Sequence, residues 1–371
     1  MRVLGFMSGT SLDAVDMAVL ETDGRGVQAF GPAGERKLTA ATREIVQAAT
    51  RQALDWPRGA PEPAIFAEAA RAVAQEHLEA AREFLGVHGL KAGDLDLIGF
   101  HGQTVSHQRP RNGRVGRTVQ LGDAALLAEG LGVPVVCDLR IADVAAGGEG
   151  APLAPIYHAA LADYSGLKRP VGVLNLGGVA NITLVGERER DLKAFDTGPA
   201  NGMIDLLVQE RGAGRFDAGG RLAEAGRVDD AALATLLDHP YFAAPPPKSL
   251  DRYDFSLEPV RALSLEDAAA TLTAFTGESV RRALDWITAP TALIVCGGGR
   301  HNPAIMARLR EALSLVVLSA EDAGWRGDSI EAEAFAYLAA RSSLSLPISF
   351  PGTTGVLTPM TGGRTVKPGK R

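Results

Sequence analysis

Twice in this chain, about 170 residues apart, an apolar run breaks into a turn that carries glycine with hydroxyl or amide residues, and then resumes. The first occurrence is VLGFMSGTSLDAVDMAVLE at 3–21, and the second is LNLGGVANIT at 174–183. Each reads as a β-hairpin, with strands at 3–6 and 15–20 and again at 171–176 and 182–185. This weak internal repeat predicts two related halves that face each other.

A third turn of the same kind, FDTGPAN at 195–201, runs into a predicted helix at 201–209 instead of a second strand. Glycine lets the backbone approach an oxyanion closely, and neighbouring hydroxyl and carboxylate groups can orient a bound metal. Three such turns suit a polyphosphate better than a packed core. They predict a nucleotide-using phosphotransferase.

The rest of the chain alternates helices and strands, which indicates an α/β fold with mixed sheets. We expect strands at 95–100 and 292–296, and helices near 39–55, 62–86, 122–130, 156–164, 266–287 and 328–342. Asn302 and Pro303 suit the start of a helix directly after the glycine turn of CGGGRHN. The span 142–155 is expected to be a loop, and the proline-rich span 238–256 a surface loop or lid.

Composition narrows the class of protein. At 371 residues the chain is long enough for two domains. A net charge of −6 argues against a nucleic-acid partner. We recognise no signal peptide and no apolar stretch of the roughly 20 residues that span a membrane. We therefore expect a cytoplasmic enzyme that does not bind membranes, with Cys137 and Cys296 as small core residues.

Eight motifs, in order and over nearly the whole chain, make it resemble the anhydro-N-acetylmuramic acid kinase family: MSGTSLDAVD, HGQT, QLGDAALLA, DVAAGGEGAPL, LNLGGVANIT, FDTGPAN, CGGGRHN and IEAEAFAYLA. That family belongs to the superfamily of acetate and sugar kinases, heat-shock 70 proteins and actin. The resemblance implies a two-lobed, actin-like (ribonuclease-H-like) duplicated fold, with mixed sheets flanked by helices and a nucleotide cleft between the lobes. We expect domain I at 1–128 plus 343–371 and domain II at 129–342.

The resemblance also implies a reaction. ATP, with Mg²⁺, phosphorylates O6 of 1,6-anhydro-N-acetylmuramic acid while water opens the anhydro bridge, in a homodimeric enzyme of peptidoglycan recycling. The nearest alternative is a kinase for another sugar, which would need no hydrolytic base. A regulatory member that only binds nucleotide is disfavoured, because it would be expected to lack a carboxylate at 196 or 331. An actin-like assembly protein is a third alternative.

Two carboxylates are the catalytic candidates that the resemblance gives. Asp196 occupies the place of the family's catalytic aspartate in FDTGPAN; its structural alternative is an Asx turn before the 201–209 helix. Glu331 matches the family's glutamate in the last long helix, near the sugar. Its alternative is a capping box with Asp328.

The nucleotide residues form three groups. The first phosphate loop is Gly9, Thr10, Ser11, Leu12, Asp13, Ala14, Val15 and Asp16, with Asp13 as an indirect Mg²⁺ contact. Ala14 stands where the family usually carries glycine, which puts a positive φ there in doubt. The second phosphate group is Gly177, Gly178, Asn181, Thr197 and Gly198, and adenine or ribose packs on Gly297, Gly298 and Gly299.

For the sugar we expect Gln103, Thr104 and Arg140, the last pairing with the lactyl carboxylate. An ion pair of Arg140 with Asp138 or Asp143 is the structural alternative. His101 is expected to be a structural histidine. Glu149 replaces a glutamine that is common in the family.

Overall fold

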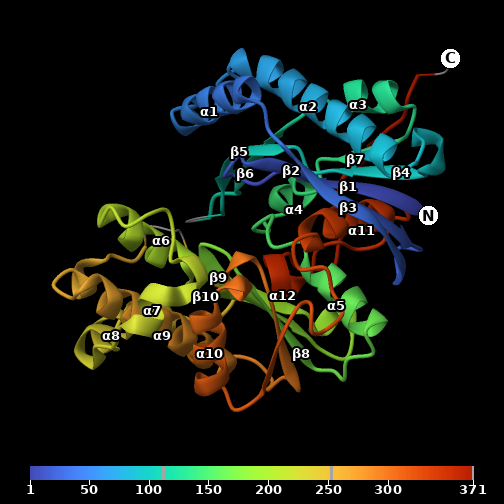
Figure 1. The fold of residues 1–371 in the computed structure, drawn as a ribbon. Helices are drawn as coiled ribbons and strands as arrows, with labels where there is room; N and C mark the ends of the chain where they lie inside the picture. The colour runs from blue at the N-terminus through green and yellow to red at the C-terminus, as the bar shows by residue number, and fades with distance from the viewer. Residues whose placement is uncertain (111–112, 251–253, 370–371) are drawn as a thin grey trace. The chain divides into compact units, whose positions relative to one another are not determined.

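The computed structural model describes residues 1–110, 113–250 and 254–369, and the chain folds into two compact units (Figure 1). Unit 1 comprises Met1–Tyr164 and Ser329–Arg371, and unit 2 comprises Ser165–Asp328. The sequence-based division placed 129–164 and 329–342 in the second domain, and the units place them in the first. The reason is packing: strand β7 (Val135–Cys137) pairs with β4 (Leu97–Phe100), and helix α11 (Ile330–Ser343) packs on β1 (Arg2–Met7).

The sheet of unit 1 has the order β13-β7-β4-β1-β2-β3. Strands β1, β2 (Ala14–Thr22) and β3 (Val27–Lys37) form an antiparallel meander, and β4 and β7 continue the sheet in parallel. Strand β13 (Arg364–Val366) closes the edge antiparallel to β7. A separate hairpin is made by β5 (Gln103–Gln108) and β6 (Arg117–Leu121).

The sheet of unit 2 repeats this plan with the order β10-β9-β8-β11-β12. The meander is β8 (Val171–Leu176), β9 (Val179–Val185) and β10 (Lys193–Pro199). The parallel continuation is β11 (Ala292–Cys296) and β12 (Val316–Ser319). Three antiparallel strands followed by two parallel ones, in the same order in both units, confirm the predicted duplicated α/β fold with mixed sheets.

Helices cover both faces of the unit 1 sheet (Figure 1). One face packs on α1 (Ala40–Leu54), α2 (Ile65–Val87) and α3 (Ala124–Leu131), where Leu4 and Phe6 enter the core. Helix α11 lies on the other face. It approaches the sheet closely because its neighbours there are glycines: a Cβ at Gly5 would lie 1.9 Å from Ala332 O, and one at Gly99 would lie 2.2 Å from Phe335 O. Gly5 and Gly99 are partners in the parallel pair of β1 and β4.

The remaining helices of unit 1 are α4 (Ile141–Ala145), α5 (Pro155–Tyr164) and α12 (Pro351–Thr354). The prediction of a loop over 142–155 is therefore wrong in its first four residues and at Pro155. The sequence IADVA forms a short helix, and Gly147, two residues after its end, has a φ of +90° that does not continue a helix.

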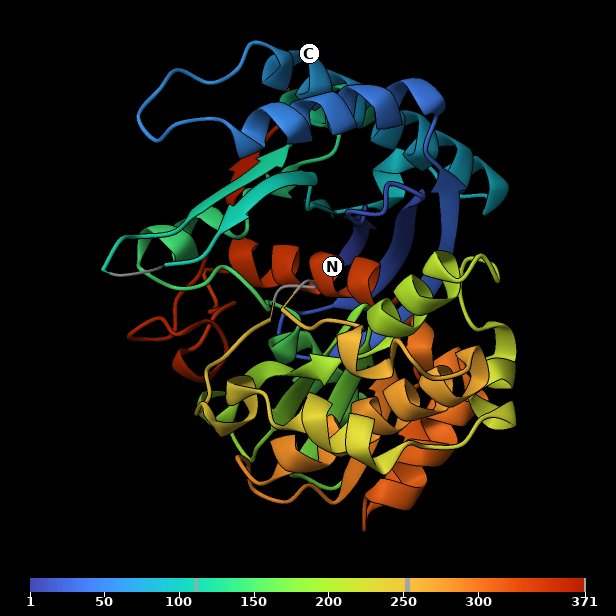
Figure 2. The same cartoon turned by 90° about the vertical axis from the view of Figure 1, so that its left-hand side faces the viewer.

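In unit 2 the long helix α9 (Leu265–Leu284) is central to the helical cover of the sheet. Four helices pack around it, as the yellow-green to orange ribbons of Figure 2 show: α6 (Asn201–Glu210), α7 (Arg221–Ala225), α8 (Asp230–Leu237) and α10 (Pro303–Ala312). The predicted start of α10 is confirmed, since the Asn302 side chain caps the amides of Ala304 and Ile305. Within the described residues we find no helix with the length and apolarity of a membrane span.

Candidate active site

The first turn of unit 1 joins β1 to β2 and is held from two sides. Leu12 N donates to Gly9 O at 3.2 Å, and the buried Gln103 amide donates to the same carbonyl, also at 3.2 Å. Thr10, Ser11 and Asp13 are exposed at the tip. The buried Ser8 Oγ has no hydrogen-bond partner among the described residues. A buried hydroxyl without a partner is costly, so this turn is suited to receive an acceptor from a ligand.

The positive φ of this turn falls on Leu12, at +58°, and not on Ala14. Ala14 lies inside β2, where it pairs with Lys37, so alanine is compatible with the backbone at that position. Leu12 and Val15 are buried in the core of unit 1. Any contact of these two residues with a ligand would therefore use their backbone.

Arg140 is fixed by two hydrogen bonds within unit 1. Its Nε donates to His101 Nε2 at 3.0 Å, and its Nη1 donates to Gly150 O at 2.8 Å. Burial and the nearby guanidinium hold the pKa of His101 well below its ordinary value, and burial lowers the pKa of Arg140 to about 10. His101 is thus a neutral acceptor that orients a charged Arg140.

The ion pairs that were the alternative for Arg140 do not form within the described part of the chain. Asp138 pairs with Arg364, and Asp143 accepts from Gly150 N at 2.6 Å and from Thr354 Oγ1 at 2.6 Å. The guanidinium is therefore not neutralised by a bonded carboxylate.

Glu331 lies in the first turn of α11 and is electrostatically coupled to Arg140. The Glu331 side chain is exposed to solvent, yet the protein packed around its carboxyl raises its pKa, and the positive charge of Arg140 acts in the opposite direction. The capping box with Asp328 is wrong, because α11 begins after Ser329, which makes no side-chain cap, and the Asp328 carboxylate pairs with Arg300 at 2.8 Å. Glu331 and Arg140 are thus brought together in unit 1.

The hairpin of β5 and β6 carries a row of polar side chains. Thr104 Oγ1 accepts from Gln120 Nε2 at 3.3 Å, and Thr118 Oγ1 bonds to both Gln120 and His107. In the described structure His107 Nε2 and Gln120 Oε1 are buried without partners. Burial lowers the pKa of His107 to about 4, so this surface presents neutral donors and acceptors of the kind that recognise sugar hydroxyls.

Unit 2 brings together the Gly177–Gly178 turn, the glycines that follow β11, and the FDTGPAN segment, which is not a turn as predicted because its first five residues belong to β10. The Gly177–Gly178 turn accepts three backbone hydrogen bonds from the start of α6, donated by Ala200, Asn201 and Gly202 at 3.1 Å each. The side-chain amide of Asn201 donates to Leu176 O, and a Cβ on Gly299 would lie 3.0 Å from the nitrogen of that side chain. These three segments therefore converge on the N-terminus of α6, whose first amides are engaged by the carbonyls of Gly177 and Gly178.

At four glycines of the predicted nucleotide turns, neither the backbone conformation nor the packing requires glycine. Gly9, Gly177, Gly178 and Gly298 lie outside the positive-φ region. A Cβ on any of them would come no closer than 3.4 Å to a described atom outside its neighbours, and at Gly298 it would meet none within 4 Å. Bare backbone with free space beside it fits a closely approaching ligand such as a phosphate chain.

Gly297 is different, since its φ is +76° and a Cβ there would lie 2.2 Å from Asn175 Oδ1. The fold itself requires glycine at this position. Thr197 and Gly198 also have structural roles within unit 2. Thr197 is buried and its hydroxyl donates to Ala180 O, and a Cβ on Gly198 would lie 2.6 Å from Ser279 Cβ.

Asp196 lies on β10 opposite Asn181 of β9, immediately before a β-bulge. Its Oδ2 accepts a hydrogen bond from Leu250 N at 2.7 Å, which joins it to a segment 54 residues further along the chain. The residue before α6 is Ala200, and α6 has no side-chain cap. A bulge commonly re-aims a neighbouring side chain next to a functional site.

No group of three His, Cys, Asp or Glu side chains with the arrangement of a metal site occurs among the described residues. Asp13 is an isolated, exposed carboxylate. Such a group suits Mg²⁺ that arrives with nucleotide phosphates and keeps several waters, because that ion needs only one or two protein carboxylates.

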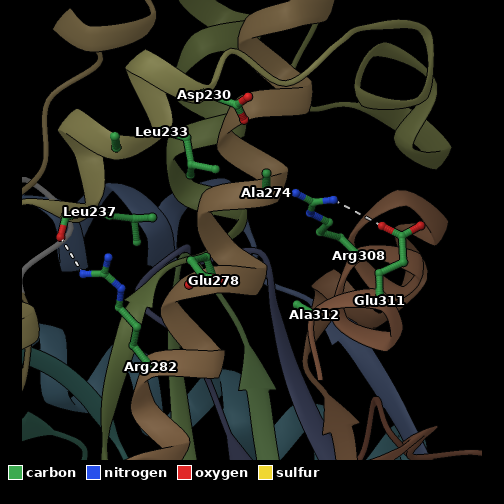
Figure 3. A pocket seen from close by; sticks show the side chains of 10 residues that line it. Asp230, Leu233, Leu237, Ala274, Glu278, Arg282, Arg308, Glu311 and Ala312 are labelled. Carbon is green, nitrogen blue, oxygen red and sulfur yellow. Dashed lines mark hydrogen bonds and ion pairs between the residues drawn. The ribbon is translucent and has the colours of Figure 1, made fainter. Parts of the chain in front are cut away.

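A groove of about 420 Å³ lies on unit 2 between α8, α9 and α10 (Figure 3). Arg282 donates to Leu237 O on one side, and Arg308 pairs with Glu311 on the other. Its lining contains none of the predicted site residues, and its cations are engaged with the protein. We therefore do not assign the reaction to it.

The sequence missed Ser8, Tyr241, Lys248 and Leu250. Ser8 precedes Gly9 in MSGTS, which is a signal that could have found it. The other three lie in the span predicted as a surface loop or lid. The Tyr241 hydroxyl donates to Asp196 O, Asp196 N donates to Lys248 O, and Leu250 N donates to Asp196 Oδ2. These contacts join positions 45 to 54 residues apart, which no local pattern encodes. Residues 251–253 of that span lie outside the described residues.

Comparison with known proteins places the chain beside one family of sequences. A family model described as "Anhydro-N-acetylmuramic acid kinase" matches residues 1–367. A protein of that name from Caulobacter vibrioides is 68% identical over 367 residues, covering 99% of both chains. Another from Phenylobacterium zucineum is 66% identical over 369 residues, covering 99% of this chain and all of the other. Among solved structures, component A of Acidaminococcus fermentans (R)-2-hydroxyglutaryl-CoA dehydratase aligns over 92% of this chain and 99% of its own, with a TM-score of 0.48 and 14% identity.

Proposed function

This chain belongs to the anhydro-N-acetylmuramic acid kinase family, and from that premise we propose which of its residues carry the reaction. The enzyme uses ATP to convert 1,6-anhydro-N-acetylmuramic acid into N-acetylmuramic acid 6-phosphate and ADP, a step in the recycling of cell-wall peptidoglycan. Water adds its oxygen to C1, the bond between C1 and O6 breaks, and O6 takes the γ-phosphoryl group as the bond to ADP breaks.

The nucleotide assignment rests on the four glycines whose backbone conformation and packing do not require glycine. Gly9 in unit 1, and Gly177, Gly178 and Gly298 in unit 2, offer backbone to a ligand and have space beside them. We assign the first three to phosphates and Gly298 to adenosine. Ser8 joins the first turn, because its buried hydroxyl otherwise lacks a partner in the described structure.

Asp196 is the proposed general base. It takes a proton from the water that attacks C1, which needs a carboxylate held in a defined position. The bond from Leu250 N to Oδ2 supports this role, because it fixes the direction of the side chain, and β-bulges are common next to active sites. Asn181 is its cross-strand neighbour, and we assign it to the same polar surface.

For the sugar we propose Arg140, Glu331 and Thr104 of unit 1. Arg140 is oriented by His101 and keeps its charge, which supports binding of the lactyl carboxylate. The raised pKa of Glu331 supports a carboxyl that can share a proton with a sugar oxygen. The Gln103 side chain is bonded to Gly9 O, so its contribution is to hold the first phosphate turn.

Three further assignments extend the proposal. Asp13 would hold Mg²⁺ through water, and the bound ion would neutralise charge on the transferred phosphoryl group. The use of ATP supports a cytoplasmic location. The family resemblance supports a homodimer, which sedimentation of the purified protein would test.

Assay of ADP release with the anhydro sugar and with free hexosamines tests the reaction itself. We expect turnover of the anhydro sugar and formation of a 6-phosphate. Phosphorylation of a free hexosamine, with the anhydro sugar untouched, would instead establish the alternative of a different sugar kinase.

A further inference from the structure

One segment of unit 2 holds the backbone and the side chain of Asp196 at once. We call residues 239–250 the strap. Asp196 N donates to Lys248 O at 3.1 Å, and Asp196 Oδ2 accepts from Leu250 N at 2.7 Å. The Tyr241 hydroxyl donates to Asp196 O. The strap therefore bonds to the amide, the carbonyl and the carboxylate of a single residue.

The strap is itself anchored in the core of unit 2. Phe242 is buried and meets Phe275 of α9 edge to face, with ring centroids 5.9 Å apart. The Arg282 guanidinium lies 5.7 Å from the centre of the Phe242 ring. The 3₁₀ turn η4 (Pro240–Ala243) thus fixes Tyr241, because its neighbour Phe242 is locked against the central helix.

Lys248 links the end of the strap to Tyr241 near its start. Its Nζ donates to Tyr241 O at 3.2 Å and lies 4.6 Å from the centre of the Tyr241 ring. The Trp286 ring, just after α9, lies 5.4 Å from the same ammonium. Partial burial lowers the pKa of Lys248, which agrees with an ammonium that has exchanged some water for aromatic faces.

A bulged strand needs this support. The register of β9 and β10 shifts between Asp196 and Gly198, so the ladder that would hold Asp196 on one side is interrupted. A general base must stay within about 0.5 Å of its productive position to be efficient. Contacts from outside the sheet can supply that constraint.

We propose that Tyr241 and Lys248 are positioning residues that, through the strap, hold the Asp196 carboxylate in place for proton abstraction. This inference rests on the proposed role of Asp196. The strap, which the sequence predicts as a surface loop or lid, thereby contributes to catalysis.

The test compares Tyr241→Phe, Lys248→Met and Lys248→Arg in the full-length enzyme. Tyr241→Phe keeps the ring and removes the hydroxyl, and Lys248→Arg keeps the charge and the donor. We expect kcat to fall about tenfold to a hundredfold in the first two variants, with the KM values for ATP and sugar changed less than about twofold, as for a misplaced catalytic group. Lys248→Arg should restore most of kcat. Lys193→Met, at the exposed start of β10, is the matched control and should match the wild type.

Hydrogen exchange at the Leu250 amide provides a readout that needs no substrate. The amide should exchange faster in Tyr241→Phe and Lys248→Met than in the wild type, and at the wild-type rate in Lys193→Met. Unchanged kcat and unchanged exchange in both strap variants would overturn the inference. A loss of activity that is no larger than the loss of folded protein in the same variant would overturn it as well. A wild-type enzyme that does not act on the anhydro sugar would contradict the proposed function, whereas the exchange rates would still decide whether the strap holds Asp196.

Discussion

At the scale of single residues, the glycines separate into those that the fold requires and those that it does not. Gly297 and Gly298 are adjacent in the same turn, yet only Gly297 has a positive φ and a crowded Cβ position. Sequence reasoning treats the two alike, because a motif such as CGGG does not say which glycine serves packing. The structure distinguishes them, and that distinction can be measured.

Gly298→Ala should leave the melting temperature unchanged and raise the KM for ATP at least several-fold, because the added methyl enters the space assigned to the nucleotide. Gly297→Ala should instead destabilise unit 2 by about 1–3 kcal/mol, through strain at φ +76° and contact with Asn175. Thermal unfolding and steady-state kinetics on both variants check this. An unchanged KM for ATP in Gly298→Ala would remove Gly298 from the nucleotide site.

At the scale of elements, close approach of α11 to the sheet fixes where Glu331 lies. Gly5 meets Ala332 O, and Ala332 follows Glu331 in the first turn of the helix. The packing of a catalytic candidate thus depends on a glycine in the opposite element.

Gly5→Ala should displace the first turn of α11, lower the stability by a few kcal/mol and reduce kcat, because its Cβ would lie 1.9 Å from a backbone oxygen. Gly34→Ala is the matched control in the same sheet, since its Cβ would make an ordinary contact of 3.7 Å with Phe84. Urea unfolding and initial rates give both quantities. Equal stability of the two variants would show that α11 accommodates the methyl without cost.

Sequence patterns predicted the buried strands and the long amphipathic helices well, because apolar runs and periodicity report burial directly. They missed β3, whose VQAFGPAGERK contains proline and two glycines, and which pairs only on one side as an edge strand. The resemblance supplied the candidate residues, but the partners of Arg140, Asp196 and Glu331 arise from contacts between segments far apart in the chain. The capping box failed for this reason, since Asp328 pairs with Arg300.

At the scale of the whole molecule, the two units differ in their buried histidines. Burial lowers the pKa of His77, His107 and His158 to about 4 and that of His101 well below its ordinary value, and all four belong to unit 1. As the pH falls, a histidine whose pKa is lowered by folding takes up its proton at a higher pH in the unfolded state than in the folded state. Its contribution to stability is therefore complete above about pH 6.5 and is lost as the pH falls toward 4.

Unit 1 should lose stability between about pH 6.5 and pH 4, by roughly 1.4 kcal/mol per pH unit for each such histidine. Hydrogen exchange at pH 7 and pH 5, corrected for intrinsic rates, measures this for each unit separately. We expect protection in β1, β4 and α2 to fall more than protection in β8, β11 and α9. An equal or greater loss in unit 2 would contradict this account of the histidines.

The central claim is that one carboxylate, Asp196, couples ring opening to phosphorylation. The most direct measurement is the ATP-dependent reaction on 1,6-anhydro-N-acetylmuramic acid in ¹⁸O-water, quenched early, with wild type and Asp196→Asn. We predict a 6-phosphate with ¹⁸O at C1 in the wild type, and a rate about 10²- to 10⁴-fold lower in a folded Asp196→Asn variant. Labelled product formed at the wild-type rate by Asp196→Asn would contradict the claim.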